Sequence, residues 1–401
     1  MPWKETNVSD HRKEFVLESL KQFINFTDLC TKYGISTKTG YKWKQRFLEE
    51  GFAGLMYQSK RPASSPSQID EDVILEIVKI KNERPKWGPK KVHAIFKRNH
   101  PNEKIPCLTS VERILRKAGL IEPRKRNRRN TGVRIENPIT AEKPNQVWTV
   151  DFKGWWYTPN KEKVNPLTVR DDYSKYILCI KALKKGDIPS VKAEFIRLFK
   201  QFGLPEVIRS DNGPPFASAM SLLGLTKLSV WWLSLGIKLD RIEPGCPYQN
   251  GGHERMHLDM MKELENQIYG DVDIHQKVFD KWRRDFNRER PHESLNMETP
   301  ESVYCKSERK FYEYEELEYP DNYRRRKVNN RGYIIIKGQA YFIGNPFTSY
   351  FVGLRPQKTG ELKVWFGHAL IGSLDEKTKL LIPEKKVINK VRKIRQVLPM
   401  S

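Results

Sequence analysis

The chain has 401 residues, 38% of them apolar, and its 73 Lys and Arg residues against 49 Asp and Glu give a formal net charge of +24. This length suits two or three domains, no apolar run approaches the roughly 18 residues of a membrane-spanning helix, and five cysteines without a C-x-x-C pair argue against a disulfide framework or a structural zinc site. Such an excess of positive charge predicts a polyanionic partner, with nucleic acid first, although a ribosomal or membrane-surface protein could share it.

Residues 1–57 are predicted to form a helix-turn-helix module. The opening ten, MPWKETNVSD, lack a basic segment followed by an apolar one, so we expect no secretory signal and a cytoplasmic protein. Apolar residues then recur at helical intervals, first in HRKEFVLESLKQF and afterwards on both sides of a Gly-Ile-Ser turn. Gly34 can end one helix in the left-handed conformation, and Ser36 can cap the next.

The second helix of this module is the candidate recognition helix. Lys38, Tyr41 and Lys42 would face outward, where we predict that they contact DNA. Trp43 and Phe47 lie four residues apart and share the opposite, packed face. The same pattern also fits a plain helical hairpin within a core.

A polar, proline-containing linker, residues 58–68, leads to a second helical module at residues 69–121. A helix is expected to start at Pro89, because proline suits the first helical position. In the same segment, RPKWGPKKV, Lys90 and Lys91 are further candidates for contacts with DNA. Two helical modules therefore stand in tandem.

Residues 122–144 form a basic linker. The stretch EPRKRNRRNTGVR has almost no apolar residue, which is typical of a segment that neutralises phosphates or serves as a solvated tether, and both can be true. We predict DNA contacts for Arg124, Lys125, Arg126, Arg128 and Arg129.

From residue 145 the pattern changes to that of an α/β domain, predicted at residues 145–306. The runs NQVWTVDFKGWWY, VNPLTVRDDYS and KYILCIKAL are rich in β-formers, and the helix IPSVKAEFIRLFKQFG follows them. A strand that runs into SDNG comes next, and after it a helix, a short strand and another helix. A linker of mixed charge, 307–330, then leads to a small β-barrel or sandwich at 331–375 and a basic tail at 376–401.

Three acids in this domain are candidates for chemistry. Asp151 lies on the first predicted strand, and Asp211 ends a later strand 60 positions on, so neighbouring strands could bring the two together. The residues after Asp211 also make a plain turn. Glu254 lies in the first turn of a predicted helix, where the helix dipole favours a negative charge whatever its role.

A cluster of these three acids would suit a divalent cation. Carboxylates brought together raise one another's pKa unless a cation compensates, which makes such a cluster a poor structural device and a good magnesium site. Two such ions about 4 Å apart can hold an attacking and a leaving oxygen in line at a phosphorus atom.

Four short motifs, met in order, resemble those of the insertion-sequence transposases with a retroviral-integrase-like core, whose active site is an Asp-Asp-Glu triad. They are WTVDFKG, RSDNGPPF, YQNGGHERMH and, closing the core, RPHESLNMETP. The tandem helix-turn-helix units, the RPKWGPKKV segment and the small carboxy-terminal β domain extend the resemblance over nearly the whole chain.

This resemblance implies the fold and the chemistry of the family. The core would be RNase H-like, and Asp151, Asp211 and Glu254 would be the catalytic residues and the ligands of two Mg²⁺ ions, with Mn²⁺ as a substitute. The enzyme would be a polynucleotidyl transferase that binds the terminal repeats of a mobile element, cleaves a phosphodiester and joins the freed 3′ hydroxyl to target DNA. Its partners would be double-stranded DNA, both element ends and target, and further copies of the chain assembled on that DNA in the nucleoid.

Other residues near these motifs compete for the same roles. Asp171 and Asp172 could be mistaken for metal ligands, but adjacent strand residues point to opposite faces, so we assign both to a turn. His253 and His257 flank Glu254, and we assign them to hydrogen bonding or packing because oxygen ligands suit a hard cation better. The interval of 43 positions from Asp211 to Glu254 is longer than in family members with the shortest spacing, and the helix between them can absorb the difference.

Two other functions fit parts of the sequence. A transposase-derived regulator would bind DNA without cutting it, and an altered acid would be its simplest sign. An RNase H-like nuclease would only hydrolyse DNA, but that function explains neither the tandem helical modules nor the order of the motifs.

Overall fold

The computed structural model describes residues 7–21, 23–57, 69–121, 139–218, 221, 224–243, 246–264, 270–313, 317–357 and 361–384. The chain divides into two compact units, Met1–Asp70 and Glu71–Ser401. Within the described parts, no helix is both long enough and apolar enough to cross a membrane. The finer domain limits that we predict stay predictions.

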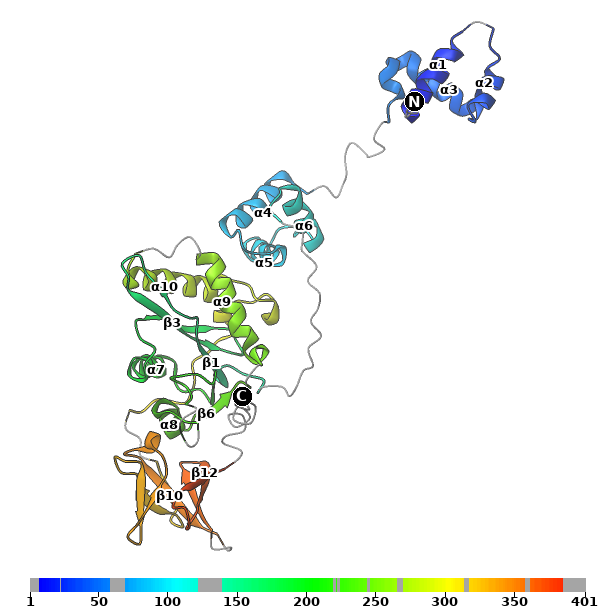
Figure 1. Ribbon diagram of the computed structural model, residues 1–401. Coiled ribbons are helices and arrows are strands. Elements are labelled where there is room, and N and C mark those ends of the chain that lie inside the picture. Colours follow the sequence, from blue (N-terminus) through cyan, green and yellow to red (C-terminus); the bar gives the residue numbers. More distant parts are fainter. Residues whose placement is uncertain are drawn as a thin grey trace. The chain divides into compact units, whose positions relative to one another are not determined.

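The first unit is a small bundle of three helices (Figure 1): α1 (Val8–Ser19), α2 (Phe26–Lys32) and α3 (Thr37–Glu50), with a 3-10 turn at Gly51–Leu55. The predicted turn between α2 and α3 forms, since Gly34 has φ +64° and Ser36 Oγ accepts a hydrogen bond of 3.2 Å from the Thr39 N–H. Gly40 lets α3 approach the core closely, because a Cβ there would lie 2.6 Å from Cys30 Sγ. The helix-turn-helix prediction for this unit is confirmed.

The second unit begins with the other helical module: α4 (Glu71–Glu83), α5 (Pro89–Asn99) and α6 (Leu108–Lys117). Trp87, Val92, Phe96 and Leu115 belong to its buried core. Pro89 is the first residue of α5, as predicted. Lys81 Nζ donates to the carbonyl of Trp87 at 2.8 Å, which ties the end of α4 to the turn before α5.

A mixed sheet of six strands lies at the centre of the α/β domain. Its strands are β1 (Val147–Phe152), β2 (Trp156–Tyr157), β3 (Lys163–Asp171), β4 (Ile177–Leu183), β5 (Val207–Ser210) and β6 (Lys238–Arg241). They pair in the order β2-β3-β1-β5-β6, and β4 also pairs with β3. The pairs among β1, β3 and β4 are antiparallel, whereas β1, β5 and β6 run parallel. The predicted first run splits into β1 and β2 around Gly154, which has φ +97°.

Helices cover both faces of this sheet (Figure 1). They are α7 (Ile188–Phe202), α8 (Lys227–Ser234), α9 (Gly251–Leu264), α10 (Val272–Arg288) and the short α11 (Pro300–Val303), with 3-10 turns at Pro247–Asn250 and Glu293–Leu295. α7 and α8 pack with Trp148 and Ile208 on one face, and α9 and α10 pack with Ile177 on the other. This is the RNase H-like core that the resemblance implies.

The carboxy-terminal part is an open antiparallel sheet with a separate hairpin. The sheet contains β7 (Arg324–Lys327), β10 (Phe351–Pro356), β11 (Leu362–Phe366), β12 (Ala369–Leu374) and β13 (Leu381–Pro383), and the hairpin contains β8 (Tyr333–Ile336) and β9 (Gln339–Phe342). One parallel bridge, Phe342 to Leu380, joins hairpin and sheet. No closed barrel is present among the described residues, so the predicted barrel is not confirmed. The sheet also extends beyond residues 331–375 on both sides, because β7 and β13 pair with strands inside that range.

Candidate active site

Asp151 and Asp211 lie at neighbouring strand ends. β1 and β5 run parallel, with Val147 opposite Val207 and Thr149 opposite Arg209. Each acid stands two residues beyond that last pair, so continuation of the register places both on the same face of the sheet, on strands about 4.8 Å apart. The 60-residue interval between the acids is the offset between paired residues of β1 and β5.

The turn after Asp211 also supports its carboxylate. The Gly213 N–H donates to Asp211 Oδ1 at 3.2 Å, and a Cβ at Gly213 would lie 3.1 Å from Asp211 Oδ2. Asn212 Nδ2 donates to the carbonyl of Ile242 at 2.6 Å, which fastens the turn beyond the end of β6. The motif is therefore both a turn and a strand end that presents an acid.

The electrostatics of Asp151 connect the three acids. Burial raises the pKa of Asp151 from 3.8 to about 7, and the charges of Asp211 and Glu254 act in the same direction. Burial also raises the pKa of Asp211. Glu254 is exposed in the first turn of α9. Asp151 thus lies near enough to Asp211 and Glu254 to feel the charge of each, a repulsion that a divalent cation bound by the carboxylate oxygens would relieve.

The described residues contain no group of three His, Cys, Asp or Glu side chains close enough together to hold a metal ion. The side chains of Asp151, Asp211 and Glu254 therefore lie near one another on one side of the sheet, but they are too far apart to bind one metal ion together. The side chain of Asp151 is 23% exposed, and His257 stands beside it, with Nδ1 4.0 Å from Asp151 Oδ2.

Two histidines hold α9 against the sheet. His253 is fully buried, with Nδ1 2.8 Å from Thr149 Oγ1 and Nε2 2.6 Å from Thr168 Oγ1, and His257 Nε2 lies 2.7 Å from the same Thr168 oxygen. Thr168 gives its single hydroxyl proton to the carbonyl of Asp151 at 2.9 Å, so both imidazoles must donate Nε2–H to it. Burial lowers the pKa of His253 well below 6.5 and that of His257 to about 3, which keeps both neutral. Their assignment to hydrogen bonding is confirmed.

Asp171 closes the turn from β3 to β4. Its Oδ1 accepts hydrogen bonds from the Ser174 N–H at 2.8 Å and from the Ser174 hydroxyl at 2.6 Å, and its Oδ2 accepts one of 2.7 Å from the Asn145 N–H. Asp172 stands in the same turn and pairs with arginines instead. Both acids have the turn role that the sequence predicts.

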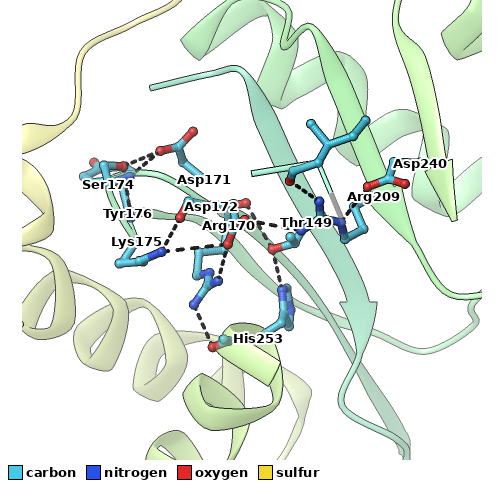
Figure 2. Close-up of polar contacts among 12 residues, drawn as sticks. Thr149, Arg170, Asp171, Asp172, Ser174, Lys175, Tyr176, Arg209, Asp240 and His253 are labelled. Atoms are coloured by element: carbon cyan, nitrogen blue, oxygen red, sulfur yellow. Dashed lines mark hydrogen bonds and ion pairs between the residues drawn. The ribbon is translucent and has the colours of Figure 1, made fainter. Parts of the chain in front are cut away.

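A largely buried set of polar side chains crosses the sheet, and Figure 2 shows its contacts. Cross-strand pairing aligns Arg170 of β3, Thr149 of β1, Arg209 of β5 and Asp240 of β6. Asp172 bridges the two arginines, with Oδ1 2.9 Å from Arg170 Nη2 and Oδ2 3.3 Å from Arg209 Nη1. We call these five residues the polar layer. Our sequence analysis missed it, although an arginine inside each of two apolar strands, TVRDD and VIRSD, was a signal.

The predicted DNA contacts on α3 are accessible. Lys38, Tyr41 and Lys42 are all exposed, and the Tyr41 ring packs on Phe26 with 4.3 Å between ring centroids. Their role in binding stays a prediction.

The basic residues of α5 face the α/β domain. Lys90 forms an ion pair with Glu293. Lys91 is half-buried, and burial, followed by the charge of Arg290, lowers its pKa to about 8. Lys90 keeps an exposed side chain, whereas Lys91 is partly covered, and contact of either lysine with DNA stays a prediction. The five basic residues predicted to bind DNA in the linker at 122–144 lie outside the described residues.

Family models match the chain in five places, in an order that follows the domains. A helix-turn-helix domain matches residues 11–63 and a homeodomain-like domain residues 39–115. Two models of the integrase core domain match residues 141–247 and 235–300. The carboxy-terminal domain of the IS481 family transposases matches residues 324–380.

Similar proteins come from bacterial insertion elements. A 31.7 kDa protein of insertion element IS407 from Burkholderia multivorans is 29% identical over 247 residues, which cover 61% of this chain and 84% of that protein. A 39.2 kDa protein of insertion element IS476 from Xanthomonas euvesicatoria is 26% identical over 284 residues, or 69% of this chain and 73% of that protein.

Solved structures with some likeness include retroviral integrases. The HTLV-2 integrase catalytic core in complex with magnesium is 19% identical, with a TM-score of 0.33, and covers 41% of this chain and 99% of that one. A chain of a simian T-cell lymphotropic virus intasome is 13% identical, with a TM-score of 0.36, and the match covers 75% of this chain and 100% of that one. Together, the family matches show amino-terminal helix-turn-helix domains, an integrase core and an IS481-type transposase carboxy-terminal domain in one chain, and its relatives are proteins of bacterial insertion elements.

Proposed function

We propose that the protein is an active DNA transposase, which binds the terminal repeats of a mobile element, cleaves a phosphodiester there and joins the freed 3′ hydroxyl to target DNA. The observation that carries this proposal is the placement of Asp151 and Asp211 on one face of the paired strands β1 and β5, with Glu254 near enough to add to the rise that burial gives the pKa of Asp151. A regulator without cleavage activity has no need for three carboxylates that repel one another. The net charge of +24 suits a polyanionic substrate.

Asp151, Asp211 and Glu254 would hold two Mg²⁺ ions, which Mn²⁺ can replace. Bound there, such ions supply charge stabilisation to the in-line displacement at phosphorus. The chain itself fixes where the acids stand. Pairing of β1 with β5 sets Asp151 beside Asp211, Thr168 holds the carbonyl of Asp151, and the neutral His253 anchors the helix that carries Glu254.

Recognition of the element ends is assigned to the helical modules. Lys38, Tyr41 and Lys42 would contact DNA from α3, where base contacts set specificity and phosphate contacts set affinity. Because an element has two ends and each core has one set of acids, we propose that at least two copies of the chain assemble on the DNA.

A strand-transfer assay with the full chain and labelled candidate ends tests this function. We expect Mg²⁺-dependent release of a 3′ hydroxyl and its joining to target DNA. A competition gel shift on the same preparation, with element ends against unrelated DNA, measures recognition. Specific binding without cleavage under conditions that permit synapsis would support the regulator instead, and cleavage without joining would support the nuclease.

The basic linker should contribute to affinity through phosphates alone. Replacing its basic run with uncharged residues is expected to make DNA affinity less dependent on salt. The slope of log Kd against log salt concentration should fall by about 0.9 for each phosphate of duplex DNA that the variant no longer neutralises. Preference for element ends should persist, because these residues would make no base contact. An unchanged slope would show that the segment is only a tether. The residues to substitute together are Arg124, Lys125, Arg126, Arg128 and Arg129.

A further inference from the structure

On β1 and β5, the residues of the polar layer come just before the acids in the sequence. Asp151 follows Thr149 by two residues, Asp211 follows Arg209 by two, and on a strand two residues lead to the next position on the same face. The third acid, Glu254, stands two residues after Gly252, in the first turn of α9. The two strands therefore carry their acids one same-face position beyond the layer, and on α9 the residue that meets Arg170 lies in the same first turn as Glu254.

Arg170 is the residue that links this layer to α9. Its Nη1 donates to the carbonyl of Gly252 at 2.6 Å, and its Nη2 donates to Asp172 Oδ1 at 2.9 Å (Figure 2). The other oxygen of Asp172 accepts from Arg209, which also donates Nε–H to Asp240 at 2.7 Å. A single guanidinium thus joins β3, the start of α9 and, through Asp172, β5. The planar guanidinium holds its donors in a fixed fork that matches these two acceptors, and the compact ammonium of lysine does not reproduce that geometry.

The start of α9 rests directly on that guanidinium. A Cβ at Gly252 would lie 2.5 Å from Arg170 Nη2, whereas a Cβ at Gly251 would meet nothing within 4 Å. Arg170 is 4% exposed and held by its hydrogen bonds, so it cannot swing aside without leaving Asp172 and the helix carbonyl. Glycine costs about 1 kcal/mol against alanine inside a helix, and this close contact explains its presence at residue 252.

We infer that Arg170 is a positioning residue of the active site, which sets the first turn of α9, and with it Glu254, at a fixed place relative to Asp151 and Asp211. This inference rests on the proposed function. A bond to the carbonyl of Gly252 fixes both the height and the rotation of the turn. His253 acts from the same turn and fixes its approach to the sheet.

Two substitutions disturb this contact from opposite sides. Gly252→Ala adds a methyl group against the guanidinium, and Arg170→Lys keeps the charge but loses one of the two hydrogen bonds. Gly251→Ala is the matched control, because it adds the same methyl group to the same turn in open space. The double variant Gly252→Ala/Arg170→Lys gives the methyl group room, so its effect should be smaller than the sum of the two single effects.

The measurements are made on the full chain. Mn²⁺ affinity, from electron paramagnetic resonance of the free ion, is the readout that a purely structural role would not move. Gly252→Ala and Arg170→Lys are expected to weaken Mn²⁺ binding and end cleavage by roughly 10- to 100-fold, the usual effect of disturbing support around metal ligands. Both variants should lose some metal-free thermal stability, because each disturbs a buried contact, yet they should stay folded and bind element ends as wild type does. Gly251→Ala should match wild type throughout.

Several results would overturn the inference. Wild-type Mn²⁺ affinity and cleavage in both Gly252→Ala and Arg170→Lys would show that the contact positions nothing. Unfolding of both variants would show that it serves stability alone. If the wild-type chain cleaves ends but the variants do so equally well, only this inference fails, whereas a wild-type chain that neither binds Mn²⁺ nor cleaves removes the proposed function as well.

Discussion

Replacement of Asp151, Asp211 or Glu254 by the matching amide should stop both cleavage and strand transfer while element-end binding survives. Asp151→Asn, Asp211→Asn and Glu254→Gln keep the size of the side chain and remove its charge. One site would carry out both displacements, so a single missing acid should affect both steps alike. A metal site supplies several kcal/mol of transition-state stabilisation, which corresponds to a fall in rate on the order of a thousandfold. Labelled ends incubated with Mg²⁺ or Mn²⁺, beside a gel shift on each preparation, measure this.

The matched control is Asp273→Asn, because Asp273 is an exposed acid in the first turn of α10, as Glu254 is in α9. It should cleave at the wild-type rate. If Glu254→Gln also joins ends at the wild-type rate, Glu254 is only a favourable charge at a helix start, and another acid such as Glu243 must be sought. If all three amide variants remain active, the metal-site proposal fails altogether.

In metal-free buffer, Asp151→Asn is expected to stabilise the protein increasingly as the pH rises. The pKa of Asp151 is about 7 in the folded chain against an ordinary 3.8, so the folded state retains a proton that the unfolded state has lost. The wild type therefore loses stability between about pH 4 and pH 7, and an amide, which cannot ionise, avoids the loss. The full difference, on the order of 4 kcal/mol at most, should be present above pH 7.

Thermal melts at pH 4, 6 and 8 in EDTA measure this effect. The variant should match wild type at pH 4 and melt several degrees higher at pH 8, while Asp273→Asn should show no such trend. A wild-type chain whose melting temperature follows that of Asp151→Asn at every pH would show that Asp151 carries no raised pKa. Added Mg²⁺ should reduce the gap, because only the wild type keeps this carboxylate as a ligand.

Local chemistry allowed much of the fold to be predicted from the sequence. The turn at Gly34, the cap at Ser36 and the start of α5 at Pro89 depend on single residues and their backbone preferences, and all three are present. Runs rich in β-forming residues likewise predicted the strand that carries Asp151 and the strand that ends just before Asp211. These features need no knowledge of distant parts of the chain.

Features that depend on distant partners could not be predicted in this way. β7 has the sequence RRRK with four exposed side chains, and it is a strand only because it pairs with β10. The burial of Arg209 likewise depends on Asp172 and Asp240, which come from another turn and another strand. The polar layer was missed for the same reason.

Because β1 pairs with β5, the chain can change the length of the loops between these strands but must keep the register of the strands themselves. Loops between the two strands can grow or shrink, and the 60-residue interval between the acids changes with them, while Asp151 and Asp211 remain side by side. A slip of one residue within either strand instead turns its acid toward the apolar face beside Trp148 and Ile208. The face of the strand on which each acid lies therefore matters, whereas the number of residues between the two acids does not. A search for distant relatives that requires a fixed interval between the two acids would discard sequences with longer or shorter loops. A search that requires only that each acid lie on the correct face of its strand would retain them.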